Sequence, residues 1–87
     1  MADLLIGRVA DYFAHQSVAG IELYDKLRRG DRIRILGHTT HLEMTIDTLQ
    51  INRQDVDEAS SGKLVGIRVP DRVRTGDRVY KQSTPVS

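Results

Sequence analysis

Residues 27–37 read Leu-Arg-Arg-Gly-Asp-Arg-Ile-Arg-Ile-Leu-Gly, and this stretch decides the fold. Ile33 and Ile35 alternate with arginines, and a period of two is typical of a strand that buries one face. Gly30-Asp31 precedes the strand. Glycine adopts positive φ without a steric penalty, and the aspartate carboxylate can accept hydrogen bonds from nearby backbone amides. We therefore predict a tight turn followed by a strand over residues 32–36.

The same pattern of a short apolar strand between turn residues continues along the chain. A strand is expected over residues 42–51, with a bulge near Asp47-Thr48, because its apolar residues change parity there. Further strands are expected over residues 63–69 and 78–81. Pro70 ends the first of these two because proline has no amide hydrogen to donate to a ladder.

The first third of the chain favours a long β-hairpin. Residues 5–10 and 18–23 are the expected strands, and residues 15–17 form the expected turn. The alternative is an amphipathic helix over residues 9–19, which lacks a convincing N-cap and would carry β-branched and aromatic residues. One helical turn is expected at residues 56–59.

Length and composition are those of one small folded domain. The chain has 87 residues, of which 39% are hydrophobic and 29% charged, and this is too apolar for a disordered protein. Six or so short strands predict an all-β fold, a closed six-stranded antiparallel β-barrel, because closure removes exposed sheet edges. The barrel is expected to span residues 1–82, followed by a flexible C-terminal tail at residues 83–87. The expected core residues are Val9, Ile33, Ile35, Met44, Ile46, Val65, Ile67 and Val79.

Five segments resemble, in order, the second domain of translational GTPases, the β-barrel of elongation factor Tu and its relatives. They are Ile6-Gly7-Arg8-Val9 and residues 27–37, 44–50, 59–67 and 73–81. The resemblance covers about residues 5–82. It implies a free-standing elongation-factor-like barrel of the translation-factor domain 2 type with a role in protein biosynthesis. Because that domain contacts tRNA ends and ribosomal RNA in elongation factors, the resemblance also implies RNA binding.

A second resemblance is to barrels at the C-terminus of some collagenase-like peptidases, several of which act in RNA modification. Residues 12–13, 18–19, 37–40 and 49–51 are similar to segments of those barrels. This resemblance implies an alternative function, a protein-interaction module that docks on a larger enzyme or on a G-domain. The near-zero formal net charge of +1 favours the alternative.

Arginine residues are the candidates for RNA contact, because the planar guanidinium suits phosphate. The six candidates lie at outward strand positions or near the last turn: Arg8, Arg32, Arg34, Arg68, Arg72 and Arg74. The glycines and aspartates of the two Gly-Asp turns are expected to be structural: Gly30, Asp31, Gly76 and Asp77. The expected partners are therefore a tRNA or rRNA, or a larger protein.

The sequence carries no recognisable catalytic or cofactor signature. The chain has no cysteine, which excludes thiol nucleophiles and thiolate metal sites. Gly62-Lys63 is followed by Leu64 and has no glycine five residues earlier, so it is not a phosphate-binding loop. His38 and His41, three residues apart on an extended segment, point to opposite faces. We expect no enzymatic activity, no catalytic residue, no nucleotide hydrolysis, no metal and no cofactor.

No stretch of the sequence has the length of a membrane-spanning helix or the order of charges of a signal peptide. The lack of cysteine fits a reducing compartment. The expected location is therefore cytoplasmic, with no membrane partner.

Overall fold

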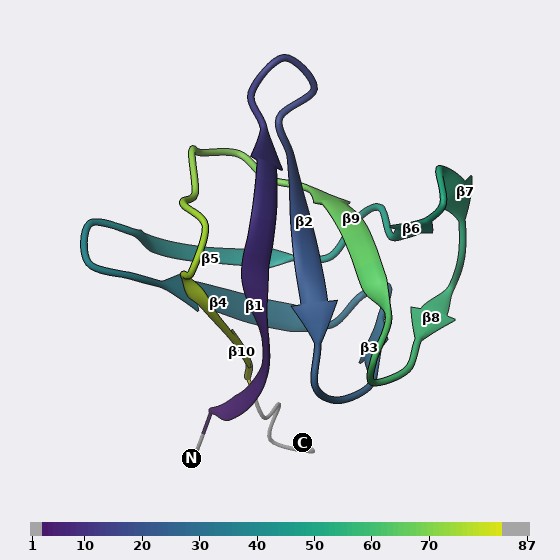
Figure 1. The fold of residues 1–87 in the computed structure, drawn as a ribbon. Coiled ribbons are helices and arrows are strands. Elements are labelled where there is room, and N and C mark those ends of the chain that lie inside the picture. The colour runs from purple at the N-terminus through teal and green to yellow at the C-terminus, as the bar shows by residue number, and fades with distance from the viewer. Residues whose placement is uncertain (1–2, 83–87) are drawn as a thin grey trace.

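The computed structural model describes residues 3–82 and has an all-β fold (Figure 1). The described residues form ten strands: β1 (Leu4–Phe13), β2 (Val18–Leu23), β3 (Leu27–Arg28), β4 (Arg32–Leu36), β5 (His41–Thr45), β6 (Gln50–Ile51), β7 (Gln54–Asp55), β8 (Glu58–Ala59), β9 (Leu64–Arg68) and β10 (Arg78–Lys81). The all-β prediction is confirmed, whereas the helical turn expected at residues 56–59 is wrong. That segment includes β8, which pairs with β3, and both Ala59 and its partner Leu27 are buried.

Eight strands form one sheet in the order β5-β4-β10-β1-β2-β9-β6-β7, and β3 with β8 forms a second, two-stranded sheet. Figure 1 shows β1 and β2 crossing in front of β4 and β5, so that the large sheet folds over on itself. The predicted closed six-stranded barrel is not found, because within residues 3–82 the end strands β5 and β7 are each paired along one side only. Pro70 lies in the segment that faces the free side of β5, and proline cannot donate a ladder hydrogen bond.

The predicted N-terminal hairpin is confirmed. Strands β1 and β2 pair along their length from Gly7 opposite Leu23 to Phe13 opposite Val18, with a register shift in β1 just after Val9. The helical alternative over residues 9–19 is wrong. Core-facing positions of the two strands lie opposite each other across the ladder. The hairpin therefore turns alternate side chains toward the core, as strands do and a helix would not.

The single strand expected over residues 42–51 is two strands, β5 and β6. The chain leaves the β5 ladder at Ile46, whose backbone amide still donates to the Asp31 carbonyl oxygen at 2.8 Å. Ile46 and Leu49 are both buried despite their odd spacing, because residues 46–49 are outside any strand. The change of parity is therefore confirmed, but an irregular segment produces it rather than a bulge.

The core is aliphatic, as the composition requires. Seven of the eight expected core residues are buried, and the exception is Met44, which is half-buried. Met44 lies on β5, an end strand of the sheet, and packs against the core from that position. The incomplete burial of Met44 thus follows from the open side of the sheet.

The tail expected at residues 83–87 lies outside the described residues. Over residues 3–82, no helix reaches the length and hydropathy needed to cross a bilayer.

Candidate interaction surfaces

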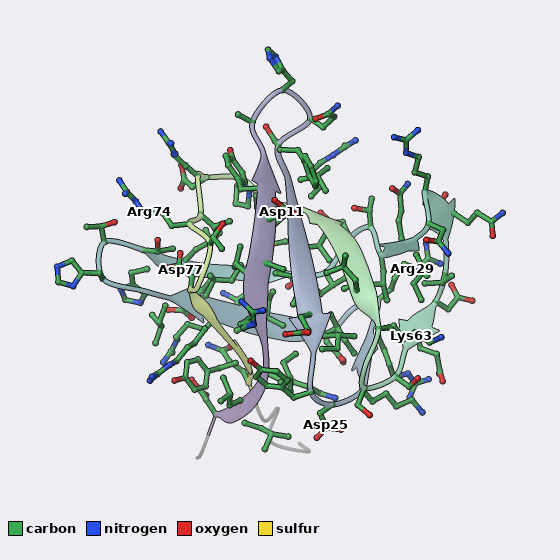
Figure 2. All side chains as sticks on the ribbon, viewed as in Figure 1. Asp11, Asp25, Arg29, Lys63, Arg74 and Asp77 are labelled. Carbon is green, nitrogen blue, oxygen red and sulfur yellow. The ribbon has the colours of Figure 1, made fainter. Side chains whose placement is uncertain are left out.

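Two turns of the same construction precede β4 and β10. In the first, Gly30 has a φ of 91°, and Asp31 Oδ2 accepts a hydrogen bond of 2.9 Å from the backbone amide three residues earlier. In the second, Gly76 has a φ of 95°, and Asp77 Oδ2 accepts the equivalent bond of 2.9 Å from Arg74. Figure 2 shows Arg74 and Asp77 on the segment before β10. All four residues of the two Gly-Asp pairs therefore hold the backbone in tight turns.

The buried Asp77 carboxylate explains the last glycine of the deciding stretch. Asp77 is only 5% exposed, and a Cβ atom added to Gly37 would collide with its carboxylate. The absence of a side chain at Gly37 therefore leaves room for the group that closes the second turn. This contact links the end of β4 to the start of β10, its neighbour in the sheet.

The six arginines proposed for RNA contact fall into two groups. Arg8 and Arg34 take part in ion pairs on the sheet surface, Arg8 with Glu22 at 2.8 Å and Arg34 with Asp3 at 3.0 Å. The acidic partners are far away in the sequence, so the spacing of the arginines did not reveal them. The other four are exposed, and no ion pair involving them is described in residues 3–82: Arg32, Arg68, Arg72 and Arg74.

Large apolar side chains lie near the start of β1, two of them exposed and one half-buried. We call them the apolar patch, which consists of the exposed Leu5 and Tyr24 and the half-buried Tyr80. Leu5 is 41% exposed and Tyr24 is 49% exposed. Leu5 lies opposite Tyr80 in the β1–β10 ladder, and the Tyr24 amide donates to the Ile6 carbonyl oxygen at 2.6 Å. The ladder and this backbone bond therefore bring three segments of the chain together at the start of β1.

Two shallow hollows follow the free side of β5. The first, of about 290 Å³, is lined by Met44, Thr45, Asp47, Arg68, Val69 and Pro70. The second, of about 280 Å³, is lined by Thr39, Thr40, His41, Leu42, Asp71 and Arg72. In both, one wall belongs to residues 39–47 and the other to residues 68–72. We call this pair of hollows the β5 seam, since a closed barrel would need backbone bonds across it.

The hydrogen-bond register defines which backbone groups of β5 face the seam. At the two ends of the β4–β5 pairing, Gly37 donates to Thr40 at 2.9 Å and Ile46 donates to Asp31 at 2.8 Å. Bonded and non-bonded pairs alternate in an antiparallel ladder. The register then directs the backbone N–H and C=O groups of three β5 residues away from β4, namely His41, Glu43 and Thr45. Among the described residues, no backbone hydrogen bond outside the ladders involves these three.

The two histidines of the β4–β5 hairpin are exposed, and His41 Nε2 lies 3.9 Å from Glu43 Oε2. Within residues 3–82, no group of three or more histidine, aspartate or glutamate side chains is placed to hold a metal ion. The hairpin therefore offers no cluster on which to build a metal site.

The described structure shifts the titration of the Glu43 carboxylate. The Gln82 side-chain amide donates to Glu43 Oε1 at 3.0 Å and, together with the nearby Arg34 guanidinium, holds the pKa of the Glu43 carboxyl below its ordinary value of 4.5. Both interactions favour the charged carboxylate, so its neutral form is disfavoured in the folded chain.

We expect Gln82→Ala to raise the pKa of Glu43 toward 4.5, because the variant removes the bond to the carboxylate. The lowered pKa means that the interaction stabilises the fold fully above pH 4.5 and is lost as the pH falls through the folded-state pKa. Carboxyl titration followed by NMR measures this shift. Gln50→Ala is the matched control, since Gln50 bonds to Asp55 instead. Equal pKa values in wild type and Gln82→Ala would contradict the prediction.

Comparison with known proteins finds relatives among proteases. No protein-family model matches the chain. An uncharacterized protease of Methanocaldococcus jannaschii is 46% identical over 76 residues, which cover 86% of this chain and 19% of the relative. A collagenase of Porphyromonas gingivalis is 30% identical over 80 residues, covering 90% of this chain and 19% of the relative. The chain thus spans about a fifth of the length of the curated relatives that it matches.

The fold is also found in solved structures. The C-terminal domain of a Geobacillus thermoleovorans protein designated a U32 peptidase superimposes with a TM-score of 0.85 at 17% sequence identity, covering 92% of this chain and 93% of that one. The selenomethionine variant of the same domain gives a TM-score of 0.83 at 18% identity, covering 88% of this chain and 98% of that one. At this level of sequence identity, the similarity shows that this chain and the Geobacillus domain share a fold, and no more than that.

These findings correct the first resemblance. The assignment to a free-standing elongation factor Tu domain 2, with the RNA-binding role in translation that it implied, is wrong: the relatives are proteases and collagenases, and the similar structures come from a peptidase. The second resemblance, to the C-terminal barrel of collagenase-like peptidases, agrees with the comparisons. The five segments that carried the first resemblance form short strands and turns. Both the elongation-factor barrel and the peptidase C-terminal domain need such elements, so they do not distinguish the two.

Proposed function

We propose that this chain is a non-catalytic accessory domain that docks on the catalytic part of a larger protein of the peptidase kind. The observation that carries the proposal is the 46% identity to a protease of which the chain matches only 19%. About four-fifths of that relative lies outside the match and is available for catalysis. The similar fold of a peptidase C-terminal domain supports the same division of roles.

The apolar patch is the surface that we assign to docking. Large exposed apolar side chains that lie together are typical of protein contact sites, and aromatic residues are enriched in them. In the Geobacillus protein the similar domain is C-terminal, so the rest of that protein precedes it. The patch lies beside the start of β1, where a preceding catalytic part would meet the domain.

The test uses a chimera in which this chain replaces the matching 76 residues of the Methanocaldococcus relative. Hydroxyl-radical footprinting compares the oxidation of Tyr24 in the chimera and in the free chain. Tyr24 is 49% exposed in the free chain, so full burial should slow its oxidation strongly. The expected result is slow oxidation of Tyr24 in the chimera only.

Phe13 provides the internal control, because it is 50% exposed and lies at the far end of β1 from the patch. Its oxidation rate should be the same in both proteins. Double substitution Leu5→Asp with Tyr24→Asp should remove the protection of Tyr80 in the chimera. Equal oxidation of every exposed side chain in the chimera and in the free chain would overturn the docking proposal.

A further inference from the structure

We propose that the β5 seam receives an extended segment of the catalytic partner, which adds to the sheet as a strand along the free side of β5. This inference rests on the proposed function, because it names the part of the partner that is bound. It also identifies a second contact, separate from the apolar patch.

The first argument is the chemistry of the free side. His41, Glu43 and Thr45 each direct one N–H donor and one C=O acceptor into the seam. Donors and acceptors that repeat every second residue are complementary to the backbone of another extended chain. Addition of a strand to a free sheet edge is a common mode of peptide recognition. The edge therefore selects an extended peptide by its backbone.

The second argument is the space beside β5. The two hollows, of about 290 and 280 Å³, lie end to end along the whole strand, from Leu42 and His41 to Met44 and Thr45. Residues 68–72 form the opposite wall, and no backbone hydrogen bond from this wall to β5 is described. The structure thus keeps the edge open where closure of the barrel would have covered it.

The third argument is the lining of the first hollow, which predicts an apolar side chain in the bound segment. Met44 is half-buried and packs against the core, and Val69 is buried at the same hollow. Each hollow contributes one aspartate and one arginine, Asp47 with Arg68 and Asp71 with Arg72. The charges in the seam therefore balance, which favours an uncharged segment with apolar residues at alternate positions.

Amide hydrogen exchange in the same chimera tests the proposal. In the free chain, the amides of His41, Glu43 and Thr45 should exchange rapidly, because no backbone acceptor is described for them. In the chimera their exchange should slow by at least about tenfold, as amides in a formed ladder are protected. The amides of Leu42 and Met44, which already face β4, should change little and serve as internal controls.

Glu43→Pro blocks the edge, because proline removes an amide that faces the seam and not one that bonds to β4. In the chimera this variant should return the His41 and Thr45 amides to rapid exchange, whereas Glu43→Gln, which keeps the amide, should leave them protected. If Glu43→Pro does not fold, Met44→Lys provides the second variant. It keeps every amide and places a charge at the first hollow, with Met44→Leu as its control.

The outcomes separate the two proposals. Protection of Tyr24 without slower exchange at His41, Glu43 and Thr45 would overturn the strand-addition proposal and leave docking intact. Absence of both effects would overturn both proposals. In a third outcome, the three amides are protected in the free chain, and their protection becomes stronger as the concentration of the chain is raised. That result would identify a second copy of this chain as the occupant and would also overturn the proposal.

Discussion

Ile35→Ala is expected to lower the free energy of unfolding by about 2–5 kcal/mol, the range for removal of a fully buried aliphatic side chain. Ile35 is 0% exposed and lies on β4, between its paired neighbours β10 and β5. Because strands pack on both sides of β4, the cavity cannot collapse by a simple shift of one neighbour. Denaturant unfolding followed by circular dichroism measures the change.

Leu64→Ala is the matched control for Ile35→Ala. Leu64 lies on β9 and is 57% exposed, so the same type of truncation should change stability by less than about 0.5 kcal/mol. The denaturant dependence of the unfolding free energy should be equal in the two variants, because neither alters the surface exposed on unfolding by much. Similar losses in both variants would contradict the assignment of inward and outward faces.

Gly7→Ala is expected to lower the free energy of unfolding by about 1–3 kcal/mol, the usual effect of forcing an extra group into a packed site. Gly7 lies on β1 opposite Leu23 of β2, and an added Cβ would collide with the backbone carbonyl oxygen of Glu22. A backbone atom cannot rotate away as a side chain can, so the two central strands of the sheet must separate. Thermal and denaturant unfolding both measure the loss.

Gly66→Ala is the matched control for Gly7→Ala. Gly66 is also a strand glycine, on β9, but its nearest contact for an added Cβ is the Val18 Cγ1 atom at 3.4 Å. That distance is close to ordinary van der Waals contact, so we expect a change of less than about 1 kcal/mol in either direction. A larger loss for Gly66→Ala than for Gly7→Ala would contradict the argument from backbone collision.

Local patterns in the sequence predict most of the strands well. The limits of β4 and β10 agree with residues 32–36 and 78–81, because alternation of apolar and polar side chains is a property of each strand by itself. The prediction of a helical turn at residues 56–59 failed for the opposite reason, because the structure of that segment depends on a distant part of the chain. Only the pairing of Glu58–Ala59 with Leu27–Arg28, about thirty residues earlier, makes that segment extended.

The arrangement of side chains on the surface was less predictable from the sequence than the positions of the strands. The acidic partner of Arg8 is Glu22 on the neighbouring strand, and the partner of Arg34 is Asp3. A spacing rule for arginines cannot include such partners, because they depend on which strands are adjacent. The apolar patch was missed for the same reason, since its members come from separate parts of the chain.

The sequence by itself determined which residues turn inward and where the chain bends. Alternation places seven of the eight expected core residues inside, and the Gly-Asp pairs lie at turns with positive φ, because both depend on interactions within a few residues. Only the tertiary structure decided that the sheet remains open beside β5. That outcome depends on how residues 41–45 meet residues 68–72, which lie more than twenty positions later. Contacts at such separation reflect the packing of the whole chain, and no local pattern encodes them.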